Sequence, residues 1–428
     1  MLSSPSSPSS PIPLWRHVAL AACMFLITAV MGFLQPFVAL YLEAAGLTRA
    51  QIGLVIGIGP GLALLAQPLL SRLSDRLDTR RPLMAAAAVS SGLAYLSYRA
   101  AHGLPTFLLL SALGTNGTIF LGAMGGVLVG RMVLDPRRGG AAYARYRVWG
   151  SIGYIVVALL TGWMVARGIA TGPRLGRAAL APVFTYGPLL FFAIAVVSLL
   201  VPDRRTLLPA GTSLSNAPQV RPGLPLNLRR FLLAYFLYQF ALYGASAYIS
   251  LYLKSLGAKP LGITGTFAAG VVCEVLVMTQ VGRFTDHFGR RPALAVAFLL
   301  MPLRLLLYPL ASTPFQVLLI QTLHGLNFGI MGAIAIVFIN DSATDLDRGA
   351  AQARLAGVGG LALSLGPAVC GFLAQRYGIG WMFVAMSGVG ACGTAVFLGW
   401  VRDSHPAPRP LPALLRPFVR LLTEPLGE

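Results

Sequence analysis

The sequence predicts an all-α membrane protein whose twelve transmembrane helices form two related halves of six. Only 11% of its 428 residues are charged and 56% are hydrophobic, whereas soluble domains carry roughly 25% charged residues. Apolar segments of about 20 residues, the length that crosses a bilayer, recur along the whole chain. Polar motifs of the first half return in the second half at an offset of 211 residues.

Twelve apolar segments are long enough to span a membrane, and a soluble fold could not bury so many apolar side chains. In order, they cover residues 17–42, 51–71, 82–101, 104–134, 148–167, 181–201, 229–256, 261–282, 292–311, 314–340, 354–376 and 379–401.

The formal net charge of +20 is distributed unevenly between the loops. If the N-terminus is inside, 24 of the 33 Lys and Arg residues lie on the cytoplasmic side. This is the positive-inside pattern of a multi-pass protein of an inner or plasma membrane, with both termini cytoplasmic. The basic excess is explained without a nucleic-acid partner.

A polar break separates six spans from six and defines the expected domains. We expect a disordered cytoplasmic tail over 1–16, a six-helix bundle over 17–201, a cytoplasmic linker over 202–228, a second bundle over 229–401 and a basic cytoplasmic tail over 402–428.

The two halves repeat a loop motif. Residues 72–75 (Arg-Leu-Ser-Asp) align with residues 283–286 (Arg-Phe-Thr-Asp), and the basic pair at 80–81 aligns with the pair at 290–291. Two parallel six-helix repeats with a site between them near the midplane are the architecture that such symmetry predicts.

Residues 282–291 resemble the loop signature of the major facilitator superfamily, which combines Gly, Asp, Gly and a basic pair. The first copy departs from it, with Ser71 for the leading glycine and Asp78-Thr79 for the second. Segments 147–154 and 323–329 resemble the branch of phenylpropionate and nucleoside permeases, which is similar in layout to lactose permease. The resemblance covers residues 17–401 and implies the major facilitator fold and solute transport by alternating access.

An aspartate at a helix end beside arginine pairs can bridge neighbouring helices in one state and release them in the other. We therefore expect a cytoplasmic gate, although the same charges could merely anchor the helices at the headgroups. Its candidate residues are Asp75, Arg76, Arg80, Arg81, Arg147, Gly282, Asp286, Gly289, Arg290 and Arg291.

Glu274 is the one acid expected deep in a span, and intramembrane acids usually serve a pathway or a proton relay. By helical rise, Arg304 and His324 reach a similar depth, so the three form a candidate proton switch. Glu274 and Arg304 as a static pair, Glu274 as a solute ligand without proton movement, and His324 as a packing residue are the alternatives.

The functional Arg and His of lactose permease fall on Arg304 and His324 by this resemblance. Here the chain has Asn327 where that permease has a coupling acid, and Gln321 where it has a Lys. The proton role would then fall on Glu274, or proton coupling would be absent.

Polar side chains recur on the expected faces of several spans, and each either lines a cavity or makes an interhelical hydrogen bond worth about 0.6 kcal/mol. This set suits a small neutral polar solute or an aromatic carboxylate better than a multivalent cation. Its members are Thr28, Gln35, Asn116, Tyr235, Gln239, Ser246, Gln321 and Asn327.

The favoured function is a secondary transporter that couples a sugar, nucleoside or aromatic acid to protons by proton symport. Its expected partners are the solute, protons and the lipid bilayer. An uncoupled facilitator, a drug or sugar efflux permease and a binding-only receptor are the alternatives. A polytopic enzyme is disfavoured because the chain has no HExxH or GxSxG run. No ATP site, metal or cofactor is expected, and we expect a monomer.

Overall fold

The computed structural model describes residues 13–76, 80–132, 139–169, 175–201, 225–343 and 348–404, and these ranges contain helices and no strand. The first half comprises α1 (Leu14–Ala44), α2 (Arg49–Arg76), α3 (Arg81–Ser97), α4 (Gly103–Met132), α5 (Gly139–Ile169), α6 (Arg177–Leu180), α7 (Val183–Tyr186) and α8 (Leu189–Leu200). The second half comprises α9 (Leu226–Ser246), α10 (Ile249–Ser255), α11 (Pro260–Phe288), α12 (Arg290–Leu307), a 3-10 turn (Tyr308–Leu310), α13 (Pro314–Ser342), α14 (Arg348–Tyr377) and α15 (Ile379–Trp400).

Ten of the twelve expected spans are long and apolar enough to cross a membrane in the described ranges, and α9 with α10, bent by 40°, makes an eleventh. The remaining expected span is α3, whose 17 residues extend about 26 Å. A turn over residues 98–100 continues it towards the next helix. The spans therefore follow the sequence prediction, with α3 shorter than expected.

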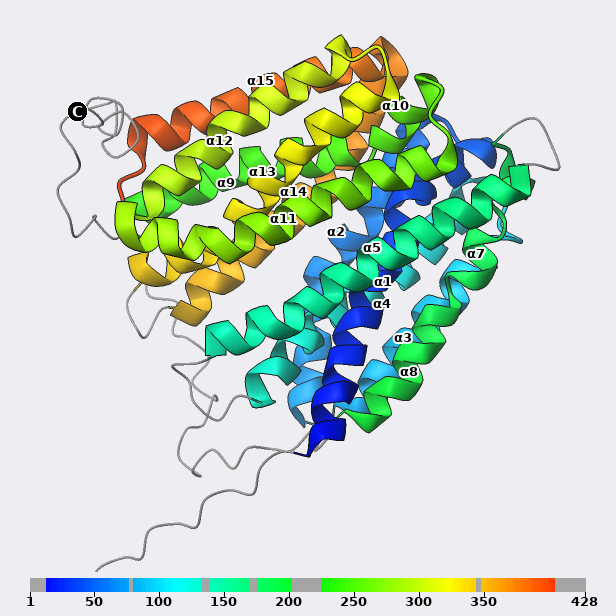
Figure 1. Cartoon of the computed structure of the whole chain (residues 1–428), viewed down its shortest axis with the longest axis horizontal. Helices are drawn as coiled ribbons and strands as arrows, with labels where there is room; N and C mark the ends of the chain where they lie inside the picture. Colours follow the sequence, from blue (N-terminus) through cyan, green and yellow to red (C-terminus); the bar gives the residue numbers. More distant parts are fainter. Residues whose placement is uncertain are drawn as a thin grey trace, which may run out of the picture.

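The helices pack as two groups (Figure 1), with α1–α8 in one and α9–α15 in the other. In the first group α1 packs on α5, and α4 on α2 and α3. In the second, α9 packs on α14 and α15, and α11 on α13. The expected tails and the linker lie mostly outside the described residues, so the domain boundaries stay predictions.

Two helix pairs make the most extensive contacts between the groups, namely α2 with α14 and α5 with α11. Glycines on α2 allow the first contact, because a Cβ at Gly53 or Gly57 would overlap the carbonyl oxygen of Pro367 or Ser364. Small residues at such positions let membrane helices approach closely, where van der Waals packing supplies the attraction.

The repeat seen in the sequence has matching local geometry. Gly46 and Gly257 both have positive φ, +91° and +81°, a conformation that favours glycine at the end of a helix. The Tyr41 hydroxyl donates to the Tyr98 carbonyl at 3.0 Å, and the Tyr252 hydroxyl, 211 residues later, donates to the Tyr308 carbonyl at 2.7 Å. We call the side of the two glycine turns the far side, and the side where α1 begins the terminal side.

We expect Gly57→Ala to lower the free energy of unfolding by about 1–3 kcal/mol, because the added methyl overlaps α14. Gly122→Ala on α4 is the matched control, since no atom lies within 4 Å of its added Cβ. Thermal unfolding of the purified protein in detergent measures both variants, and equal effects would contradict the close packing.

Candidate functional site

Two adjoining pockets lie in the bundle. The inner pocket, about 180 Å³, receives residues from both halves. The outer pocket, about 560 Å³, runs along α9 and α13 to Gly349 near the start of α14, and thus towards the terminal side. They share Leu242, Tyr243 and Phe328. The inner pocket is lined by Thr28, Met31, Gln35, Arg147, Ser151, Tyr154, Leu242, Tyr243, Ser246, Phe267, Val271, Glu274, Gln321, His324 and Phe328.

An ion pair crosses between the halves in the inner pocket. Arg147 Nη2 on α5 lies 3.3 Å from Glu274 Oε1 on α11, and the side chains are 31% and 6% exposed. Glu274 is the fifteenth residue of α11, about 21 Å along the helix, so its carboxylate is deep in the span. The sequence predicted this depth but not this partner, because it placed Arg147 in the cytoplasmic gate.

Arg147 lies in the cavity because α5 begins at Gly139, nine residues before the expected start of this span. The residue is therefore about 12 Å inside the helix rather than at its end. Gly150 and Gly153 let this part of α5 approach α1, since a Cβ at either would overlap Thr28 or the Phe25 carbonyl. This packing fixes the face of α5 that carries Arg147.

Arg304 does not pair with Glu274, so the static pair considered from the sequence is absent. Its guanidinium is fully buried and lies 2.7 Å from His324 Nδ1. A guanidinium only donates hydrogen bonds, so Nδ1 accepts and carries no proton in this arrangement. The Nε and Nη2 atoms of Arg304 have no hydrogen-bond partner among the described residues.

Glycines on α13 allow this helix to pack closely against α11. A Cβ at Gly325 would overlap the backbone of Cys273 and Glu274, and one at Gly329 would crowd Val277. The two helices can therefore approach closely, which brings His324 and Glu274 into the lining of one pocket.

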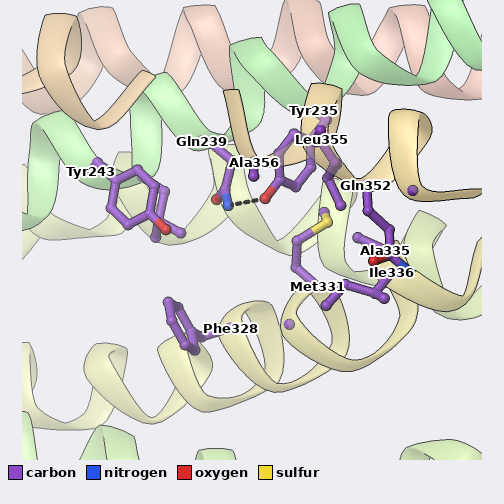
Figure 2. A pocket seen from close by; sticks show the side chains of 14 residues that line it. Tyr235, Gln239, Tyr243, Phe328, Met331, Ala335, Ile336, Gln352, Leu355 and Ala356 are labelled. Atoms are coloured by element: carbon purple, nitrogen blue, oxygen red, sulfur yellow. Dashed lines mark hydrogen bonds between the residues drawn. The ribbon is translucent and has the colours of Figure 1, made fainter. Parts of the chain in front are cut away.

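Six of the eight expected cavity residues line a pocket. Thr28, Gln35, Ser246 and Gln321 line the inner pocket, and Tyr235 and Gln239 line the outer one. Figure 2 shows the hydrogen bond in which Gln239 Nε2 donates to the Tyr235 hydroxyl at 2.8 Å. In the inner pocket the Tyr154 hydroxyl donates to Gln35 Oε1 at 2.9 Å.

Asn116 and Asn327 line neither pocket, which corrects the expectation for both. Asn116 Nδ2 donates to the carbonyls of Ala112 and Gly59, at 2.8 and 3.2 Å, between α4 and α2. Asn327 is fully buried, and its Nδ2 donates to the Ala297 carbonyl at 2.8 Å. Both amides bind neighbouring helices within one half, the packing alternative stated for them.

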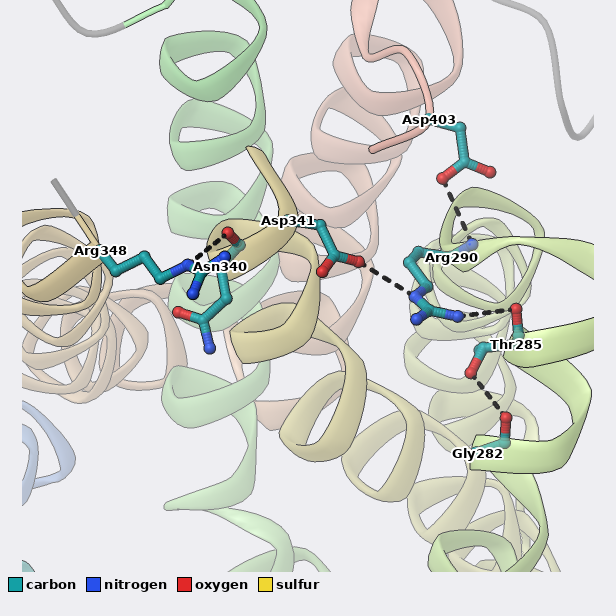
Figure 3. A network of polar contacts seen from close by, with 7 residues as sticks. All are labelled: Gly282, Thr285, Arg290, Asn340, Asp341, Arg348 and Asp403. Carbon is teal, nitrogen blue, oxygen red and sulfur yellow. Dashed lines mark hydrogen bonds and ion pairs between the residues drawn. The ribbon is translucent and has the colours of Figure 1, made fainter. Parts of the chain in front are cut away.

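Arg290, an expected gate residue of the second half, contacts three polar residues on the terminal side (Figure 3). Arg290 Nε lies 3.2 Å from Asp341 Oδ2, its Nη1 donates to the Thr285 carbonyl, and its backbone N–H donates to Asp403 Oδ1. Gly289, with φ +91°, provides the turn between α11 and α12. These contacts stay within one half.

Arg291 is fully buried and donates to the carbonyls of Leu398 and Val401 at the end of α15. This contact satisfies carbonyls that the end of a helix leaves free, which gives Arg291 a capping role in this conformation. In the first half, the gate candidate Arg80 also contacts a residue of its own half, because its Nε donates to Ser74 Oγ at 2.9 Å.

Two further gate candidates lie at the surface. Arg76 and Gly282 are exposed, and no atom lies within 4 Å of a Cβ added at Gly282. The side chains of Asp75 and Asp286 lie outside the described residues.

The sequence did not predict a set of contacts that joins the halves on the far side. Lys254 Nζ lies 2.7 Å from Glu43 Oε2, and these residues occupy equivalent positions of the repeat. Arg49 Nη1 donates to the Ala374 carbonyl at 3.1 Å, and the Tyr248 hydroxyl donates to the Arg49 carbonyl at 3.0 Å. The halves are therefore joined on the far side, and the offset of 211 was the signal that could have found the Glu43–Lys254 pair.

A family model described as the MFS_1 like family matches residues 17–385. The chain belongs to the MFS_1 like family. It is therefore a multi-pass membrane transporter of the major facilitator superfamily, as the sequence motifs predicted.

Two individual relatives match the chain at 26% and 29% sequence identity. Over 382 residues the MFS_1 like chain is 26% identical to the maltose permease of Geobacillus stearothermophilus, covering 87% of this chain and 92% of that protein. It is 29% identical to the cis,cis-muconate transport protein of Acinetobacter baylyi over 246 residues, covering 55% and 58%.

Solved structures share its fold. A mutant of the nucleoside transporter NupG superposes with a TM-score of 0.73 at 16% identity, covering 89% of this chain and 98% of that one. A bacterial homologue of the lysosomal transporter Spinster, in an inward-facing and occupied conformation, gives a TM-score of 0.69 at 14% identity, covering 91% and 97%.

A charge swap tests the far-side pair. Glu43→Lys should destabilise the protein because it places two cations together, and adding Lys254→Glu should recover the loss, with a coupling energy of about 0.2–1 kcal/mol for such a partly exposed pair. Thermal unfolding of the four forms at low and high salt measures this coupling, which salt should weaken. Additive effects of the two substitutions would show that the pair does not hold the halves together.

Proposed function

We propose that this protein is a secondary active transporter that moves a small organic solute by alternating access, coupled to proton binding at Glu274. The observation that carries the proposal is the ion pair between Glu274 on α11 and Arg147 on α5, at 3.3 Å in a pocket lined by both halves. A solute in this pocket contacts both moving units at once.

Protonation of Glu274 provides a way to couple chemistry to movement. The ionised carboxylate holds α11 to α5 through Arg147, and a proton removes the charge that sustains this contact. Losing a hydrogen bond between charged groups costs about 1.5–3 kcal/mol, which is large enough to shift an equilibrium between two conformations. The proton thereby favours a different arrangement of the two halves.

The conformation described here is joined on the far side and has its outer pocket directed to the terminal side. With both termini in the cytoplasm, the orientation that the distribution of Lys and Arg favours, this is an inward-open state. In the outward-open state, Asp75 and Asp286 with their neighbouring arginines would close the terminal side.

The solute class is proposed from the lining and the relatives together. Hydroxyls, amides and aromatic rings line the inner pocket, a composition that fits sugars, nucleosides and small organic acids. One relative is a maltose permease, another is a cis,cis-muconate transport protein, and a structural neighbour is a nucleoside transporter.

Glu274→Gln should abolish accumulation driven by a pH gradient, because the amide cannot release a proton, while solute exchange across the membrane continues. Uptake of labelled maltose, uridine and cis,cis-muconate into proteoliposomes, with and without the gradient, measures this difference. Glu274→Asp is the control, since it keeps a carboxyl group and should retain gradient-driven accumulation.

Unchanged accumulation by Glu274→Gln would remove this residue from the mechanism. Wild-type uptake that ignores the gradient would instead favour an uncoupled facilitator. Another relative is the multidrug resistance protein MdtG of Salmonella paratyphi C, at 22% identity over 336 residues. Inside-out vesicles should therefore be assayed in parallel, so that efflux is tested as well as uptake.

A further inference from the structure

The charges around the inner pocket do not balance. The described residues that line it include one acid, Glu274, and one arginine, Arg147, and a second arginine, Arg304, lies directly behind His324. Arg304 is fully buried and forms no ion pair with any described acid. The pocket is therefore cationic even while Glu274 is ionised.

Among the described side chains that line the inner pocket, the Glu274 carboxylate is the one that can take up a proton. Arg147 and Tyr154 face the pocket from α5, Tyr243 from α9 and His324 from α13, while α1 contributes only uncharged side chains. His324 Nδ1 already accepts from Arg304 at 2.7 Å, and a second cation beside that guanidinium is opposed by charge repulsion. A proton that enters the pocket therefore binds the carboxylate.

Once Glu274 is neutral, Arg147 loses its ion-pair partner. Its side chain is 31% exposed and lines the inner pocket, whereas Arg304 is shielded by His324. A guanidinium presents paired N–H donors that match the two oxygens of a carboxylate. An uncharged solute would leave this cation without a compensating charge inside the membrane.

We infer that the transported solute carries a carboxylate, and that this group binds Arg147 in place of Glu274 when the acid is protonated. This inference rests on the proposed function. One proton on Glu274 and one carboxylate on Arg147 enter together, so a monocarboxylate moves without net charge. The rings of Tyr154, Phe267 and Phe328 would contact the apolar body of the solute.

Matched acid and amide probes test the inference on the purified full-length protein. Calorimetric titration with benzoate and benzamide, phenylacetate and phenylacetamide, and hexanoate and hexanamide compares a carboxylate with a neutral group of the same size. Wild-type protein should bind the carboxylates more tightly as the pH is lowered from about 8, because protonated Glu274 releases Arg147. The amides should show no such dependence.

Glu274→Gln should bind the carboxylates about 10- to 100-fold more tightly than wild type at the higher pH, the factor expected for a hydrogen bond to a charged group. The double variant Glu274→Gln/Arg147→Gln should lose this gain, and it leaves no charge of the pair unmatched, so it guards against misfolding. Equal gains for acids and amides, or a gain that persists in the double variant, would overturn the inference.

Transport assays separate this result from the proposed function. Gradient-driven accumulation of maltose or uridine without any preference for carboxylates would keep the transporter and reject the carboxylate. Binding of carboxylates that depends on Arg147, with no solute moved in any liposome assay, would support the anion site and reject the transporter.

Discussion

A charge inside a bilayer persists where a partner or water compensates it, and Glu274 meets this condition through Arg147 on the opposite half. The pair is asymmetric in its surroundings, because the carboxylate is nearly buried and the guanidinium is partly open to the pocket. Whatever changes the charge of the carboxylate therefore changes the contact between α5 and α11. In the proposed mechanism, this one interaction ties the protonation of a side chain to the relative position of two bundles.

The position of this pair depends on close packing between helices. Gly150 and Gly153 seat α5 on α1, and Gly325 and Gly329 seat α13 on α11. Since lipid gives no hydrophobic drive for helices to associate, such close packing supplies the attraction. These glycines thus hold the two charged residues in register, and glycines on α2 allow the close packing that joins the halves on the far side.

Much of this architecture follows from the sequence, because span length and loop charge are set by the bilayer itself. The depth of Glu274 also followed, since helical rise converts sequence distance into depth. Its partner did not, because the apolar run that marked the span starts later than the helix, so Arg147 was assigned to the membrane surface. Asn116 and Asn327 were assigned to the cavity for a related reason, since periodicity identifies a polar face but not the helix that covers it.

The contact between Glu43 and Lys254 has a consequence for how such a chain can be assembled. Residues at equivalent positions of a repeat meet each other where they lie on the twofold axis, as in a symmetric dimer. A protein built from two copies of the first half would bring two glutamates together there, and one built from two copies of the second half would bring two lysines together. Opposite charges at this point require unlike halves, which a single fused chain supplies in a fixed one-to-one ratio.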